Sequence, residues 1–277
     1  MALVMPSTAA MARQETPLDA SLWAFLGQLN QLLGLLFVLR QSLKKVEQEI
    51  QTLLSSTPPQ RFVLGLGSVL SVGDITAYPS KRLYRTYTAT VWEAIDETYL
   101  TAIHTMMARH SAWTVAQAYE AFETFVNDIA EGFVHALPTT TRPVTRRRRR
   151  RQQTKKVLDR LRSEAPQIGE WEQANSRGLD LRQWYDVVGE VRHAITHSDE
   201  VIPARVLRGF SSERRTLLRQ CFPGMEAGES YSLRLDVEDA TRALRIFGDY
   251  AFVVFKALCI QQGYDWNILV TMLRTSS

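Results

Sequence analysis

Apolar and aromatic residues recur at helical spacing through long stretches of this chain, and this periodicity constrains the fold more than any other feature. Between Val115 and Ala136 they fall on one side of a helix, at Phe122, Phe125, Ile129 and Phe133. A second such stretch runs from about Val237 to Gln262, with Asp236 placed to cap it. Aromatic residues at this spacing form a core far more often than a cofactor site. The sequence therefore predicts an all-α fold.

Other helices are predicted from the same spacing and from capping and breaking residues. They cover about Leu18–Leu54, Leu83–Arg109 and Leu179–His197. Ser111–Thr114 is expected to break the pattern between two helices, and residues 61–80 read as β-like or irregular. A short helix near residues 211–219 and a short strand at Tyr231–Leu235 are expected before the last helix.

These elements suggest three parts: a disordered terminus over 1–17, an N-terminal helical region over 18–110, and a helical domain over 111–273. The last part contains a basic linker over 138–156. Residues 22–39 are the most apolar segment, but Gln28, Asn30 and Gln31 interrupt it, which favours a buried or interface helix over a membrane span. Only two cysteines and no secretory signal indicate a reducing, cytoplasmic setting.

One segment makes the protein basic. Residues 142–162 hold eleven basic residues and one acid, Asp159, for a local charge of +10; the whole chain carries +4, so the remainder carries 4 − 10 = −6. A run of like charges is either a solvated linker or an arm that binds phosphates, with RNA as the most available polyanion. The candidate nucleic-acid-binding residues are Arg146, Arg147, Arg148, Arg149, Arg150, Arg151, Lys155 and Lys156.

A polar cluster at Glu190, Arg192, His193 and His197 lies between apolar flanks. An arginine can hold phosphate oxygens with its planar fork, and a histidine can move a proton near neutral pH. Arg192 and His197 are five residues apart, which separates them by roughly 140° around a helix. They can meet at one phosphate only if the helix ends between them, if the arginine wraps, or if a second chain supplies one partner. Ser198 and Asp199, followed by Pro203, also allow the helix to end just after His197.

The segment Glu190-Val-Arg192-His193-Ala-Ile-Thr-His197 resembles the HEPN family, whose mark is R-x4-6-H with a polar residue directly after the arginine. Residues 119–130 also look like the opening helix of a HEPN bundle. The likeness covers about residues 112–273. It implies a HEPN-like up-and-down helical bundle, here with an N-terminal helical extension and a short irregular or β-like insert.

The resemblance implies an endoribonuclease that needs no metal or other cofactor. The RNA 2′-hydroxyl would attack the adjacent phosphate and leave a cyclic phosphate. Arg192 would hold the phosphate, His197 would act as acid and base, and His193 would orient the site. Glu190, outside the minimal motif, could pair with Arg192 or fix a histidine tautomer. The family commonly works as homodimers in toxin–antitoxin or phage-defence systems, so an antitoxin or regulatory protein is a possible partner.

Three alternatives stay open. The chain could be a non-catalytic helical module that binds nucleic acid or a protein. Glu190, His193 and His197 could share a helix face and bind zinc or iron, although a di-iron bundle would require a second E-x-x-H that the chain lacks. The cluster could also be purely structural, with Arg192 in a salt bridge and the histidines half-buried.

Overall fold

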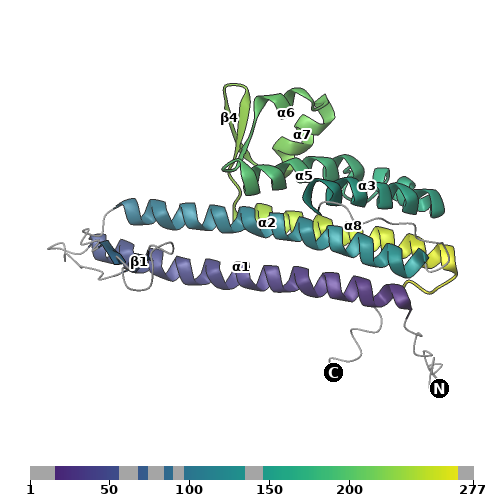
Figure 1. The fold of residues 1–277 in the computed structure, drawn as a ribbon, viewed down its shortest axis with the longest axis horizontal. Coiled ribbons are helices and arrows are strands. Elements are labelled where there is room, and N and C mark those ends of the chain that lie inside the picture. Colours follow the sequence, from purple (N-terminus) through teal and green to yellow (C-terminus); the bar gives the residue numbers. More distant parts are fainter. Residues whose placement is uncertain (1–15, 56–67, 74–83, 90–96, 135–145, 268–277) are drawn as a thin grey trace, which may run out of the picture. The chain divides into compact units, whose positions relative to one another are not determined.

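The computed structural model describes residues 16–55, 68–73, 84–89, 97–134 and 146–267 (Figure 1). The predicted disordered terminus, apart from residues 16 and 17, and the loop expected at 138–143 lie outside the described residues. The described chain is mostly helical, so the all-α prediction is confirmed at this level. The helices are α1 (Pro17–Ser55), α2 (Glu97–Val134), α3 (Arg146–Glu164), α4 (Gln167–Gln173), α5 (Leu181–His197), α6 (Ala204–Arg208), α7 (Ser212–Cys221) and α8 (Val237–Gln262).

Short strands accompany these helices. Two form an antiparallel pair, and three form a small sheet in the order β3-β5-β4. They are β1 (Ser68–Gly73), β2 (Tyr84–Ala89), β3 (Val201–Ile202), β4 (Gly224–Ala227) and β5 (Ser230–Leu233). The strand predicted at Tyr231–Leu235 corresponds to β5.

The chain divides into two compact units, one of residues 1–37 and 108–277 and the other of residues 38–107. The expected boundary between residues 110 and 111 falls inside α2, and the break expected at Ser111–Thr114 is wrong. The Thr114 hydroxyl donates to the His110 carbonyl oxygen at 2.8 Å, and Ser111 is fully buried. A threonine that bonds the preceding turn in this way can stay inside a helix.

In the smaller unit, the helix expected from Leu83 begins only at Glu97. Tyr84–Ala89 forms β2 instead, in antiparallel register with β1, where Ser68 pairs with Ala89 and Gly73 with Tyr84. Alternating threonine and tyrosine in this stretch suits a strand better than a helix, because β-branched and aromatic residues are both enriched in strands. β1 lies within the segment predicted to be β-like or irregular.

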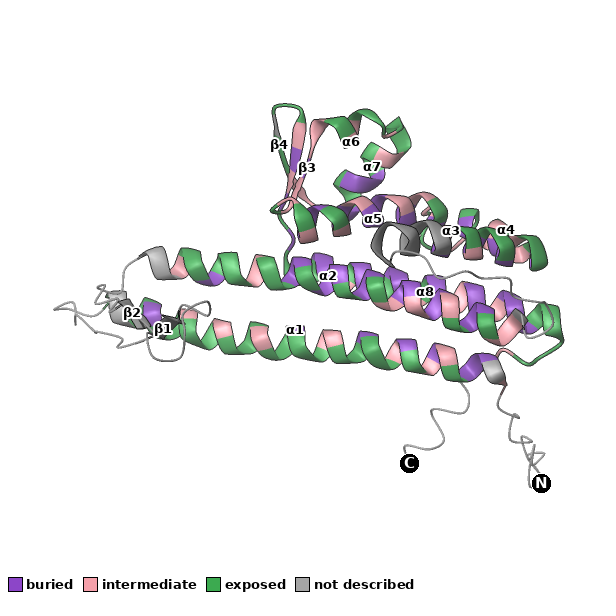
Figure 2. Ribbon diagram, viewed as in Figure 1, coloured by how far each residue is buried: buried purple, intermediate pink, exposed green. Residues whose placement is uncertain are grey.

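The core of the larger unit is a layer of aromatic side chains from several helices. The Phe122 ring of α2 lies 5.0 Å from Tyr250, 5.5 Å from Phe247 and 5.6 Å from Tyr185, between ring centroids. Trp184 of α5 meets Phe247 edge-on at 4.7 Å. Figure 2 shows the buried face of α8 that these contacts create. The aromatic spacing predicted to be core-forming in α2 and α8 is therefore confirmed.

A buried ion pair links α3, α4 and α8. Arg162 donates to both carboxylate oxygens of Glu172, each at 2.8 Å, and to the Tyr250 hydroxyl at 3.1 Å; Tyr250 in turn donates to Glu172. Glu172 is only 1% exposed. Burial raises the pKa of the Tyr250 hydroxyl well above its ordinary value, and the neighbouring Glu172 charge adds to this. The phenol therefore stays protonated and can donate.

Helix α1 is long and apolar enough to cross a membrane by length and composition. Within Leu18–Thr52, the most apolar window of 18 residues has a mean hydropathy of 1.7, and 22% of that window is buried. Leu35 and Val38 are more than half exposed, at 69% and 62%. The expectation that this segment is a buried or interface helix, and not a membrane span, stays a prediction.

Replacing Glu172 with alanine should lower the free energy of unfolding by about 3–5 kcal/mol, because Arg162 would be left buried without its counter-ion. The exposed pair Arg177–Asp249 provides a matched control, and Asp249→Ala should cost less than about 1 kcal/mol. Urea unfolding followed by circular dichroism would measure both. Equal losses for the two variants would show that the buried pair has no special role.

Candidate functional site

The predicted motif lies on α5, whose observed bounds agree with the predicted helix. Asp180 caps it, since its carboxylate accepts from the backbone N–H of Gln183 at 2.9 Å. The helix is amphipathic, and its buried face includes Trp184, Val188, Val191 and Ile195. These positions recur at three- and four-residue spacing, so the packing of this face fixes the rotation of the helix. The motif's polar residues are thereby placed on the flank and the outer face.

Arg192 lies on the flank and forms an ion pair with Glu120 of α2. The Arg192 side chain is 17% exposed, whereas that of Glu120 is 50% exposed. The Nε of Arg192 is buried and makes no hydrogen bond. A buried guanidinium N–H without a partner is unfavourable. Glu120, which the sequence did not single out, is thus a carboxylate partner of Arg192.

His193 and His197 lie on the outer face of the last helical turn. Their ring centroids are 5.0 Å apart with the planes tilted by 55°, and both residues are exposed. Glu190, one turn before His193, is half-buried. The two histidines are thus accessible to a substrate from solvent. They are not half-buried, as the structural alternative supposed.

The helix continues through the whole motif and ends directly after His197. The possibility that it ends between Arg192 and His197 is therefore excluded. The backbone N–H groups of Ser198 and Glu200 both donate to the Ala194 carbonyl, at 3.0 and 3.1 Å. Because the helix is unbroken, Arg192 and His197 keep the roughly 140° separation expected from their spacing. Two of the three expected ways for Arg192 and His197 to meet at one phosphate remain. The arginine side chain can wrap around the helix, or a second chain can supply one of the two residues.

The residues after the helix hold a strained backbone conformation. Asp199 and Glu200 have φ angles of 46° and 65°, in the left-handed region that favours glycine. Such a conformation costs roughly 1–2 kcal/mol for a residue with a β-carbon. Desolvation raises the pKa of the Glu200 carboxyl, the neighbouring Asp199 charge adds to this, and Arg109 of α2 opposes it. Strain of this kind often lies beside functional residues, and sequence reasoning did not detect it here.

The predicted phosphate-binding segment is helical over part of its length. Arg146 begins α3, so the basic linker expected over 138–156 is a helix from that residue onward. The side chains of Arg146–Arg151 lie outside the described residues. Lys155 forms an ion pair with Asp186 of α5, whose other oxygen accepts from Arg214 at 2.5 Å, whereas Lys156 is exposed. The pairing of Lys155 helps attach α3 to α5, so this lysine is less available to RNA than the sequence suggested.

A metal site is not seen in the described part of the chain. Across residues 16–55, 68–73, 84–89, 97–134 and 146–267, no group of three or more His, Cys, Asp or Glu side chains is placed to hold a metal ion. Glu190, His193 and His197 share one side of α5, but they do not form a ligand set. The metal alternative for these residues is therefore not supported by their geometry.

Sequence reasoning missed Glu120 because pairing across two helices cannot be read from either helix alone. Together, the site offers a cation held by Glu120, two accessible imidazoles and a strained turn, which suit the binding of an anion and the transfer of a proton. Comparison of the chain with protein-family models, curated proteins and solved structures finds no match.

Proposed function

We propose that this protein is a metal-independent endoribonuclease of HEPN type. The observation that carries the proposal is the exposed pair His193–His197 on the same helix as an arginine held by a carboxylate. The aromatic layer that joins α2, α5 and α8 is taken as a HEPN-like up-and-down bundle, with α1 as its N-terminal extension. The resemblance of the R-x4-H segment supports both assignments. A role as a toxin or phage-defence effector follows from the same resemblance, and the cytoplasm is proposed as its location from the two cysteines and the missing secretory signal.

In the proposed reaction the ribose 2′-oxygen bonds to the adjacent phosphorus as the bond from phosphorus to the next 5′-oxygen breaks. The products are a cyclic phosphate and a free 5′-hydroxyl. His197 serves as acid and base, so the proton lost by the 2′-hydroxyl is balanced by one delivered to the 5′-oxygen. Arg192 stabilises the charge that develops on the phosphoryl oxygens. His193 orients the substrate, and Glu190, one turn before it, supports the imidazole.

The proposed active unit is a homodimer. Within one chain, Arg192 turns toward Glu120 on α2 while His197 lies on the outer face of α5. Two copies that bring their α5 faces into one cleft would place Arg192 of one chain near His197 of the other. Glu120 is half exposed, so a phosphate that arrives from solvent can compete with it for Arg192.

The proposal predicts RNA cleavage by the purified protein in EDTA. Wild type should cut RNA and leave cyclic-phosphate ends. His197→Ala should lower the rate by about 10²–10⁴-fold, and Arg192→Ala by about 10²–10³-fold. His104→Ala and Arg182→Ala are matched controls, since both side chains are more than 60% exposed and lie outside the motif. Circular dichroism should show unchanged helicity for all four variants.

Unchanged cleavage by pure His197→Ala or Arg192→Ala protein would contradict the proposed roles. Activity that is absent in EDTA but appears with added zinc or manganese would instead support the metal site of Glu190, His193 and His197.

Mixing two inactive variants tests the shared site. In a heterodimer of Arg192→Ala with His197→Ala, one composite site has both residues intact and the other has neither. Mixed subunits should therefore recover up to about half the activity per heterodimer, whereas each variant alone stays inactive. No recovery, with heterodimers shown by native mass spectrometry, would place the complete site within a single chain.

The second candidate function is a non-catalytic module that binds nucleic acid or a protein partner. The ion pair between Arg192 and Glu120 favours this function, because an arginine that is already paired can have a purely structural role. RNA binding without cleavage by wild type would identify it. A protein partner such as an antitoxin would fit either function.

The basic segment predicts a salt-dependent contribution to RNA binding. Replacing Arg146–Arg151 with glutamine should weaken binding and flatten the plot of log affinity against log salt. On single-stranded RNA the slope should fall by about 0.7 for each phosphate that the variant no longer neutralises. Lys44→Gln with Lys45→Gln, two exposed cations of α1, is the matched control. An unaltered slope in the glutamine variant would remove this segment from the RNA-binding surface.

A further inference from the structure

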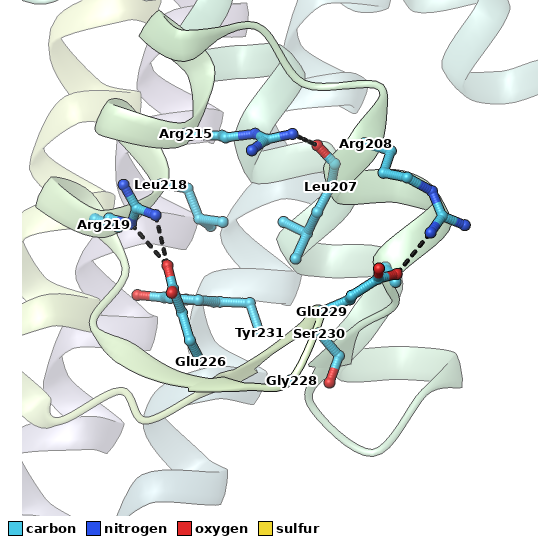
Figure 3. Close-up of a pocket in the computed structure, with 11 residues that line it drawn as sticks. Leu207, Arg208, Arg215, Leu218, Arg219, Glu226, Gly228, Glu229, Ser230 and Tyr231 are labelled. Atoms are coloured by element: carbon cyan, nitrogen blue, oxygen red, sulfur yellow. Dashed lines mark hydrogen bonds and ion pairs between the residues drawn. The ribbon is translucent and has the colours of Figure 1, made fainter.

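A cavity lies apart from the motif, in the small module that follows α5. Figure 3 shows it between α6, α7 and the β4–β5 hairpin. Its volume is about 290 Å³. None of Glu190, Arg192, His193 and His197 lines it. Three arginines, Arg208, Arg215 and Arg219, do. We call this space the arginine cavity.

The hairpin that closes the arginine cavity depends on close packing. A β-carbon at Gly224 would lie 2.3 Å from the Ser232 carbonyl oxygen and 2.7 Å from the Tyr231 ring, so only glycine fits there. Tyr231 is buried, and its hydroxyl donates to the Phe222 carbonyl at 3.0 Å. The turn contains Gly228, whose φ of +61° also favours glycine. The wall of the cavity is therefore held in place before any ligand arrives.

The charges around the cavity form close ion pairs that are exposed to solvent. Arg208 donates to Glu229 at 2.6 Å, and Arg219 donates to Glu226 at 3.1 Å through Nε. All four of these side chains are more than half exposed. Such pairs contribute little to stability, so a competing anion can take over their cations.

Arg215 differs from the other two arginines. It donates to the Leu207 carbonyl oxygen at 3.0 Å, which anchors one arm of the guanidinium at the cavity. Within the described part of the chain it has no carboxylate in an ion pair. An anchored guanidinium that faces a cavity with donors to spare is suited to a planar, two-point contact with an oxyanion.

The geometry points to a binding site for a phosphorylated ligand in the arginine cavity. Arg215 provides the first contact, and Arg208 and Arg219 turn from their glutamates to the phosphate oxygens. Leu207, Leu218 and the Tyr231 ring supply an apolar wall for the organic part of the ligand. A phosphate dianion offers enough oxygens for several arginine forks, whereas a single carboxylate does not. This site is independent of the proposed cleavage, because it shares no residue with the motif.

Binding of 5′-AMP, with adenosine and inorganic phosphate beside it, would test the site by isothermal titration calorimetry on the full chain. AMP should bind in the roughly millimolar range or tighter, and adenosine should not. Arg215→Gln should weaken AMP binding about tenfold or more. Arg182→Gln, an exposed arginine of α5, should not change it. Phosphate binding without an AMP advantage would keep the anion site but remove the apolar wall from recognition.

Glu226→Gln gives a change in the opposite direction. It removes the carboxylate that competes for Arg219, so AMP should bind about threefold tighter or more. A purely structural role of these residues predicts no such gain. RNA oligomers with and without a 5′-phosphate then separate the two sources of the ligand. Tighter binding of the 5′-phosphorylated oligomer would identify the ligand as a terminal phosphate of RNA. Tighter binding of AMP would identify it as a free nucleotide. No binding of either AMP or phosphate, or equal binding by wild type and Arg215→Gln, would overturn the proposal.

Discussion

The buried contact between Arg162 and Glu172 organises the larger unit. It joins α3 to α4, and Tyr250 extends it to α8, at the centre of the aromatic layer. A buried charge is costly unless it is paired and hydrogen-bonded, so these three side chains require one another in a fixed arrangement. Desolvation keeps the Tyr250 hydroxyl protonated, which lets it serve as the donor that completes the carboxylate. Three helices from different parts of the chain are thereby held in register.

The aromatic layer determines what α5 presents to solvent. Trp184 and Tyr185 anchor one face of this helix against Phe247 and Phe122. Once that face is buried, the 3.6-residue period leaves His193 and His197 outward and Arg192 on the flank. The position of the proposed site is thus a consequence of core packing, not of contacts among the polar residues themselves. The same packing explains why Arg192 and His197 diverge within one chain and why a second chain is part of the proposed active unit.

The two proposed sites are connected through the end of α5. The strained residues Asp199 and Glu200 lead directly into β3, and the Glu200 carbonyl accepts from the backbone N–H of Leu233 at 2.9 Å. Leu233 belongs to β5, which with β4 closes the arginine cavity. The cavity module is therefore attached to the motif helix by a short segment. The proposed phosphorylated ligand and the proposed RNA would bind to neighbouring parts of the same unit.

The sequence by itself determined the helical class, the approximate extents of α5 and α8, the cap at Asp236, and the aromatic positions of the core. These features arise from local periodicity and capping, which a single chain displays directly. Sequence reasoning was wrong at Ser111–Thr114 and at the start of α2. In the first case the Thr114 hydroxyl donates to the His110 carbonyl oxygen inside the helix, and in the second Tyr84–Ala89 pairs as a strand with β1.

Only the tertiary structure showed that Arg192 pairs with Glu120 and Lys155 with Asp186, and that three arginines gather around one cavity. These contacts join residues that lie far apart in the chain or on different elements. Their formation depends on how whole helices pack, and no spacing rule within one segment encodes it.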